Sequence, residues 1–242
     1  NRLLKTALLV IMGLLVFSGC SKKSAPAADP TQFTPAQALS LPGCKNLYRV
    51  SETLYRGAQP TAEGFKKLKK LGIKTVLNLR DLHSDQDKLE GAQLKYITIP
   101  METWDPEMEQ VRWFLQAAAN PENQPVFVHC QHGADRTGTM TAAYRIVIEG
   151  WTKERAIQEM TEGPFGFHEI WTGLPKFLDK LDWDTLRAEF YKQKKNNNKI
   201  LEVIPKPSLE DNDTTELNHG KEVFKMIFIT NNQTSIVLKP GE

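Results

Sequence analysis

Short apolar runs alternate with amphipathic segments through the middle of the chain. Runs rich in β-branched and other apolar residues predict strands at 48–50, 53–56, 73–79, 94–99 and 125–129. Apolar residues that recur with a helical period predict helices at 61–71, 106–119, 137–149, 152–160 and 168–192. This alternation predicts an α/β fold, with a central, mainly parallel sheet flanked by helices.

Capping residues mark the ends of two of these helices. Thr61 is suited to cap the first helix, and Gly72 follows its last residue. Asp105 is expected to be the N-cap of the second helix, with Pro106 at the first helical position.

The two ends of the chain differ from this central part. Residues 1–20 begin with basic side chains, continue as a short apolar run and end in Phe17-Ser18-Gly19-Cys20, which is the pattern of a secretory signal. Residues 21–43 are rich in Ser, Ala, Pro and Thr and are interpreted as a flexible linker. We expect a folded domain at 44–193 and a polar tail at 194–242, in which 222–230 and 234–238 could pair as a β-hairpin.

Small residues directly before Cys20 resemble the signal of bacterial lipoproteins, in which this cysteine is lipidated and becomes the mature N-terminus. Phe17 stands where that pattern usually has Leu. An ordinary cleaved signal with an incidental cysteine is the alternative. The resemblance implies an exported, periplasmic or cell-envelope protein that is anchored to a bacterial membrane if Cys20 is acylated.

Composition excludes several classes of protein. Charged residues make up 25% and hydrophobic residues 40% of the chain, which is typical of globular proteins. A net charge of +2 gives no support for nucleic-acid binding. The three cysteines, Cys20, Cys44 and Cys130, are too few for a disulfide framework. No His/Cys cluster has zinc-ligand spacing, so neither a metal nor another cofactor is expected.

The segment from His129 to Gly138 has the composition of a phosphate-binding loop. It lies between a predicted buried strand and a predicted helix, so its amides can turn inward while the helix dipole adds positive potential. Gly133 allows the tight turn, and the planar fork of Arg136 can hold two phosphate oxygens. The residues expected to surround a phosphate are Gln131, His132, Gly133, Ala134, Asp135 and Arg136.

Cys130 is the candidate nucleophile at the base of this loop. The helix dipole and Arg136 favour its thiolate, which is the form that attacks phosphorus. Thr137 is expected to donate a hydroxyl hydrogen bond to the Cys130 sulfur and so stabilise the departing thiolate. His129 is expected to support the loop by orienting it. The alternative for Cys130 is a buried structural thiol.

An acid must also protonate the leaving oxygen, and its carboxylate must later act as a base towards water. Asp105 is the candidate, and its rivals are Asp81, Asp85 and Asp87. Arg80 and Asp81 are interpreted as a structural pair beneath the loop, and 166–168 as a possible wall of the pocket.

The pattern His-Cys-x5-Arg-Thr-Gly, with Asp-Pro upstream, resembles the dual-specificity branch of the protein tyrosine phosphatase superfamily. Segments 54–60, 72–80 and 163–168 are similar to a bacterial group related to the plant and fungal atypical dual-specificity phosphatases. The resemblance covers roughly residues 46 to 183. It implies that Cys130 is the nucleophile, Arg136 the phosphate ligand and Asp105 the general acid.

The expected function is therefore that of a phosphomonoesterase acting on phosphotyrosine in proteins, with phosphoserine and phosphothreonine as further substrates, through a phosphocysteine. The same chemistry on an inositol phosphate or another small phosphate ester is an alternative. The absence of lysine from the variable loop positions disfavours highly anionic inositides, whereas export disfavours protein substrates because protein kinases are scarce outside the cytoplasm. Two other classes remain: a non-catalytic phosphate-binding module and a rhodanese-like sulfurtransferase.

Overall fold

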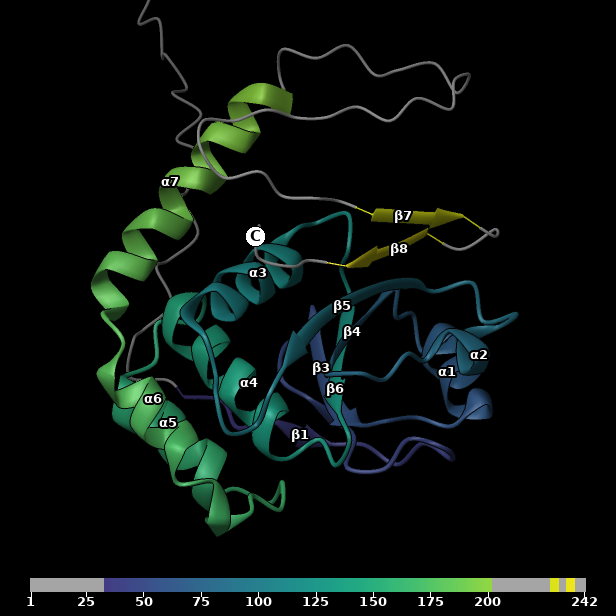
Figure 1. The fold of residues 1–242 in the computed structure, drawn as a ribbon, viewed down its shortest axis with the longest axis horizontal. Coiled ribbons are helices and arrows are strands. Elements are labelled where there is room, and N and C mark those ends of the chain that lie inside the picture. The colour runs from purple at the N-terminus through teal and green to yellow at the C-terminus, as the bar shows by residue number, and fades with distance from the viewer. Residues whose placement is uncertain (1–32, 202–226, 231–233, 238–242) are drawn as a thin grey trace, which may run out of the picture. The chain divides into compact units, whose positions relative to one another are not determined.

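A single sheet organises the part of the chain that the computed structural model describes, which is residues 33–201, 227–230 and 234–237. Its strand order is β1-β2-β3-β6-β4-β5-β8-β7 (Figure 1). The strands are β1 (Gln37–Ala38), β2 (Tyr48–Arg49), β3 (Leu54–Ala58), β4 (Thr75–Arg80), β5 (Lys95–Met101), β6 (Val126–Cys130), β7 (Ile227–Thr230) and β8 (Thr234–Val237). Strands β3, β6, β4, β5 and β8 pair in parallel, and the outer pairs are antiparallel. The predicted mainly parallel α/β fold is confirmed.

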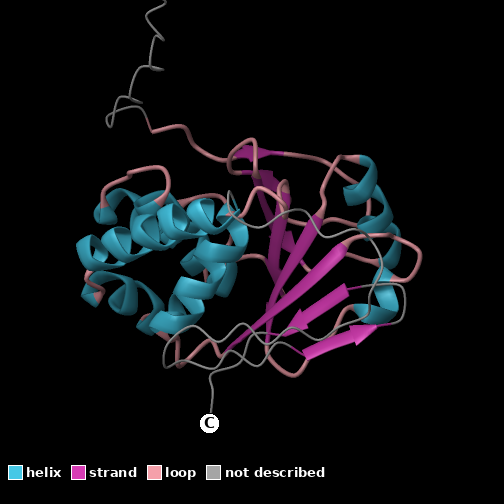
Figure 2. Ribbon diagram, turned by 90° about the horizontal axis from the view of Figure 1, so that it is seen from above, coloured by secondary structure: helices cyan, strands magenta, loops and turns pink. Residues whose placement is uncertain are grey.

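Helices cover both faces of this sheet (Figure 2). The helices are α1 (Ala62–Lys70), α2 (Gln86–Leu89), α3 (Met108–Ala119), α4 (Asp135–Val147), α5 (Lys153–Glu162), α6 (Gly173–Lys180) and α7 (Trp183–Leu201), with a 3-10 turn at Glu169–Trp171. Helices α1 and α2 pack on one face, whereas α3 to α7 contribute to the larger apolar cluster on the other. The sheet is therefore buried on both sides, as parallel sheets usually are.

Strand β6 shows how the two faces are divided. Its alternate residues Val126 and Val128 belong to the apolar cluster of α3 to α7, together with Cys130. Phe127 belongs to the cluster of α1 and α2, and the ring of His129 stacks on it with centroids 5.8 Å apart. Because successive strand residues point to opposite faces, the candidate nucleophile and the histidine before it lie on opposite sides of the sheet.

One helix start agrees with the expectation, and two others differ from it. Thr61 caps α1 as predicted, accepting a hydrogen bond from the Gly64 amide. Asp105, however, is not the cap of α3, which begins at Met108 with Glu107 as its N-cap. The reason is a capping box, in which Glu107 and Gln110 bond each other's backbone amides and start the helix later. The helix expected at 137–149 starts at Asp135 instead, directly after the loop.

The helical region expected at 168–192 is divided into three elements. These elements are the 3-10 turn, α6 and α7. Between α6 and α7, the carboxylate of Asp182 accepts a hydrogen bond from the Thr185 amide at 3.1 Å. A side-chain acceptor at this place satisfies an amide that has no partner within the new helix, and so favours a fresh start.

Both ends of the described chain join the sheet. Strand β1 lies within the segment expected to be a linker, so the folded part begins before the expected boundary at residue 44. The Ala36 amide also donates to Glu159 on α5 at 3.3 Å. The expected hairpin is present as β7 and β8, and β8 pairs in parallel with β5. The signal and lipidation predictions for residues 1–20 fall outside the described residues, and no described helix has the length and apolar character to cross a membrane.

Candidate active site

Cys130 is the last residue of β6, at the carboxyl edge of the parallel strands. It is 2% exposed and stands opposite Ala58 of the neighbouring strand β3. The loop at 131–134 connects it to α4, whose first amides have no carbonyl partner within the helix. The strand, loop and helix therefore form the anion-binding arrangement expected from the sequence, with the thiol at its base.

Gly133 fits the loop for a steric reason. Its φ angle is +72°, a conformation that side chains rarely allow. A Cβ atom at this position would lie 2.3 Å from the carbonyl carbon of Gly57 and 2.4 Å from the Ala58 amide nitrogen. The loop thus rests directly on the end of β3, which sets the depth of the anion site.

Arg56 supports the loop from below, a role that the sequence analysis did not assign. It is 1% exposed, and its Nη2 donates to the carbonyl oxygens of Gly133 at 2.8 Å and Ala134 at 3.4 Å. Its guanidinium lies 3.8 Å from the ring centroid of Phe165. Burial lowers the pKa of Arg56 to about 10, so it remains charged at neutral pH. Because Arg56 binds these two carbonyls, the loop can turn amides rather than carbonyls toward an anion.

Arg136 lies on the first turn of α4 and is half-buried. Its Nη1 donates to the carbonyl oxygen of Met101, at the end of β5, over 3.1 Å. That is its one hydrogen bond to a described residue, so most donors of the fork remain available to a ligand. The contact also brings the segment after β5, which carries Asp105, next to the loop.

Asp105 is exposed in a bend between β5 and α3. Its carboxylate makes no hydrogen bond or ion pair with any described residue. Its neighbour Trp104 is 69% exposed, whereas Thr103 is buried. The position of Asp105 is therefore set by the backbone of this bend and not by contacts of its own side chain with described residues.

Thr137 does not make the expected hydrogen bond to the Cys130 sulfur. Its hydroxyl is fully buried and has no hydrogen-bond partner among the described residues. The helix begins two residues earlier than predicted, so the first turn fixes the position of Thr137. A thiol sulfur is a weak acceptor, which gives the hydroxyl little reason to turn toward it.

A buried polar network lies beneath the loop on the α1 and α2 face. His129 Nδ1 lies 3.1 Å from the Cys130 carbonyl oxygen, and Nε2 lies 3.1 Å from Asp85 Oδ2. Gln59 donates to the other oxygen of Asp85 and accepts from Arg80. Burial alone would raise the pKa of Asp85, but His129 and Gln59 outweigh it and hold that pKa below its ordinary value. The partner of Arg80 in this network is Gln59, which replaces the expected pair with Asp81.

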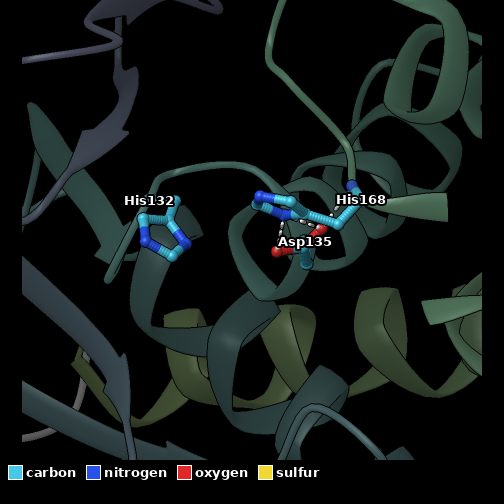
Figure 3. Close-up of side chains that lie close together, drawn as sticks. All are labelled: His132, Asp135 and His168. Atoms are coloured by element: carbon cyan, nitrogen blue, oxygen red, sulfur yellow. Dashed lines mark hydrogen bonds and ion pairs between the residues drawn. The ribbon is translucent and has the colours of Figure 1, made fainter. Parts of the chain in front are cut away.

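The side chain of Asp135 turns away from the phosphate space. It is buried and accepts from the His168 amide at 2.9 Å and from His168 Nδ1 at 2.9 Å (Figure 3). His132 is exposed, and its ring centroid lies 5.3 Å from that of His168. Gln131 is exposed and Ala134 is buried. Asp135 therefore holds the segment 166–168 against the loop, at the place where a pocket wall was expected.

Comparison with known proteins decides the family. Residues 43–170 match the family described as a DSP-PTPase phosphatase fused to NAD+ kinase. The chain is 35% identical over 188 residues to the dual specificity protein phosphatase TpbA of Pseudomonas aeruginosa, spanning 76% of this chain and 83% of the relative. The chain belongs to the dual-specificity phosphatase family.

Solved structures agree with this membership. Crystal structures of P. aeruginosa TpbA match at a TM-score of 0.59 and 35% identity, over 64% of this chain and 96% of the other. One of these structures is a cysteine-to-serine variant in complex with phosphotyrosine, at 34% identity. The catalytic domain of the PP-IP phosphatase SIW14 from S. cerevisiae has the same fold, at a TM-score of 0.56 and 23% identity. The sequence prediction of the family is thus confirmed, and the chain is a phosphatase of the dual-specificity type.

Proposed function

We propose that this phosphatase hydrolyses phosphotyrosine in proteins, and phosphoserine or phosphothreonine as further substrates, through a phosphocysteine. The observation that carries the proposal is the position of Cys130 at the base of a loop whose carbonyls are bound from below by Arg56. The phosphotyrosine complex of a relative at 34% identity supports the choice of substrate.

In the first step, the Cys130 thiolate attacks phosphorus and the bond to the ester oxygen breaks. The loop amides and Arg136 hold the equatorial oxygens, where charge builds up in the transition state. Asp105 gives its proton to the leaving oxygen, which departs as the free hydroxyl of the substrate. Its exposure lets it reach the leaving oxygen beside the loop, and it stays a carboxylate until the second step.

In the second step, water attacks the phosphocysteine and gives its proton to the Asp105 carboxylate. The bond between phosphorus and sulfur breaks, releasing inorganic phosphate and the thiolate. Thr137 offers the unpaired, buried hydroxyl that this leaving thiolate needs. A thiolate is a much better acceptor than a thiol, so the hydrogen bond forms when the charge appears.

Exposed apolar side chains favour an aromatic phosphoester over a highly charged one. Leu82 is 93% exposed after β4, and Trp104 is 69% exposed after β5. These parallel strands end at the same edge as β6, so both residues follow strand ends beside the loop. Ile170, which is 80% exposed, follows His168, whose side chain contacts the loop at Asp135. Exposed apolar residues near a site are suited to contact a substrate ring.

The substrate is tested by measuring kcat/KM for matched peptides that carry phosphotyrosine, phosphoserine or phosphothreonine, and for inositol phosphates. We expect the phosphotyrosine peptide to be the best substrate of the series. A higher kcat/KM for an inositol phosphate would overturn the substrate and leave the chemistry in place. If no ester is hydrolysed but inorganic phosphate still binds, the domain is a non-catalytic phosphate-binding module.

We also propose that the protein is exported and anchored to a bacterial membrane through acylated Cys20. The support is the basic start, the apolar run and the small residues before this cysteine. Mass spectrometry of the mature N-terminus is expected to find a lipid-modified cysteine. An unmodified Cys20, or cleavage at another residue, would contradict the anchor.

A further inference from the structure

Two histidines and an aspartate converge at the rim of the catalytic loop (Figure 3). His132 and Asp135 belong to the loop and the first turn of α4, and His168 comes from the segment after α5. One candidate ligand atom of each of the three lies within 4.8 Å of the others. The proposed phosphatase reaction uses none of these three side chains, so their convergence needs another explanation.

We propose that His132, Asp135 and His168 form a binding site for a divalent transition metal of the zinc type. Imidazole nitrogen and carboxylate oxygen are the donors that such ions take, whereas Mg²⁺ and Ca²⁺ prefer oxygen ligands alone. Three protein ligands leave a fourth position open, which is the arrangement of a site that exchanges water or an anion.

Hydrogen bonds from two side chains hold the two segments of this site together. The side-chain amide of Asn46 donates to the His132 carbonyl oxygen at 3.0 Å and to the Phe165 carbonyl oxygen at 2.9 Å. It therefore joins the loop to the segment that leads to His168. Asp135 joins the same two segments through the amide and ring of His168. Ligands on segments fixed in this way lose little conformational entropy on binding a metal.

A small rearrangement completes the coordination. Donor atoms around tetrahedral zinc, with bonds of about 2.0–2.2 Å, lie roughly 3.3–3.5 Å apart. Asp135 and His168 are already at hydrogen-bond distance, so mainly His132 must move inward. Its side chain is exposed and makes no hydrogen bond with any described residue, so rotation costs little.

Metal binding changes the contact between His168 and Asp135. His168 Nδ1 lies 2.9 Å from Asp135 Oδ2, where it is placed to donate a proton. When a metal binds through this nitrogen, a neutral imidazole carries its proton on Nε2 instead, and the carboxylate then faces the ion.

The full chain is titrated with Co²⁺ while visible absorption is recorded, and Zn²⁺ is then added in competition. We expect one Co²⁺ per chain in a nitrogen and oxygen environment, without a sulfur-to-cobalt charge-transfer band. His132→Ala and His168→Ala should each weaken binding at least about tenfold. His132→Ala removes no hydrogen bond between described residues, and an unchanged urea unfolding curve shows that the fold is kept.

Two control variants separate this site from its neighbours. His83→Ala removes an exposed histidine elsewhere and should leave the affinity unchanged. Cys130→Ser should also keep Co²⁺ binding, because the nucleophile is not a ligand. Loss of binding in Cys130→Ser, a sulfur charge-transfer band, or unchanged affinity in His132→Ala and His168→Ala would each overturn the proposal. None of these readings depends on turnover, so they do not test the proposed phosphatase function.

Discussion

Asp85 and Asp105 follow neighbouring parallel strands, and their surroundings are opposite. Asp85 is fully buried and surrounded by Gln59, His129 and Tyr96. Asp105 is exposed and makes no hydrogen bond with a described residue. The first carboxylate is kept ionised and in place by its neighbours, whereas the second can exchange a proton with a ligand or with water. Position after a strand therefore does not identify the acid by itself, and the proposed choice of Asp105 rests on its exposure and its lack of side-chain partners among the described residues.

Replacing the proposed nucleophile is expected to cause the largest loss of activity. This loss is the reference against which the two aspartate variants are compared. Cys130→Ser should lower the turnover of p-nitrophenyl phosphate by about 10⁴-fold or more, because a serine hydroxyl is not ionised at this pH. Release of p-nitrophenol measures it, and an unchanged unfolding curve shows that the fold is intact. Turnover within tenfold of the original rate would mean that another residue is the nucleophile.

Asp85→Asn should mainly affect stability. Removing the charge of a buried carboxylate that accepts hydrogen bonds from Gln59 and Tyr96 costs about 1–3 kcal/mol of the free energy of unfolding, measured in urea. The pKa of Asp85 is lowered in the fold, so its contribution is present above the ordinary value of 3.8 and is lost as pH falls through the lower folded value. The two stability curves should therefore converge below about pH 4. Equal stability at pH 7 would contradict a supporting role for the network.

Asp105→Asn should show the opposite pattern. It should reduce kcat by about 10²-fold for esters with a poorly leaving alcohol, and remove the basic limb of the pH profile. Its urea midpoint should not change, because the side chain is exposed. Asp87→Asn is the matched control, since Asp87 is also exposed and was a rival candidate. An unchanged profile in Asp105→Asn, or a loss in Asp87→Asn, would assign the acid elsewhere.

Trp104→Ala should have the smallest effect and should be seen in binding. We expect KM for a phosphotyrosine peptide to rise a few-fold, as for the loss of about 1 kcal/mol of aromatic contact. Inorganic phosphate, which has no ring, should bind with unchanged affinity. An equal loss for both ligands would mean that Trp104 positions the loop and does not contact the substrate.

The fold was largely predictable because its signals are local. Apolar runs located the strands from β2 to β6, and Thr61 marked the start of α1. Errors fell where two caps competed: Asp105 and Glu107 both suit the start of α3, and only the reciprocal bonds with Gln110 decide between them.

The site was predictable only in part, because its supports are distant in sequence. The loop motif located Cys130, Gly133 and Arg136 from spacing alone. Arg56 and Asp85 reach the loop from β3 and from the segment after β4, and no periodicity indicates such contacts. The segment 54–60 was recognised by resemblance, and that was the available signal for Arg56. His168 lies far from His132 in the sequence, so ligand spacing could not indicate the cluster that we propose as a metal site.

Strand β8 determines which strand stands at the open edge of the sheet. It pairs with β5 along Tyr96 to Thr98 and so occupies backbone groups that would otherwise be open at a sheet edge. A long, β-branched edge strand is a template for intermolecular strand addition and aggregation. A chain that ended after α7 would keep its catalytic loop and leave these backbone groups of β5 without a strand partner. Strands β8 and β7 thus move the open edge of the sheet from β5 to β7.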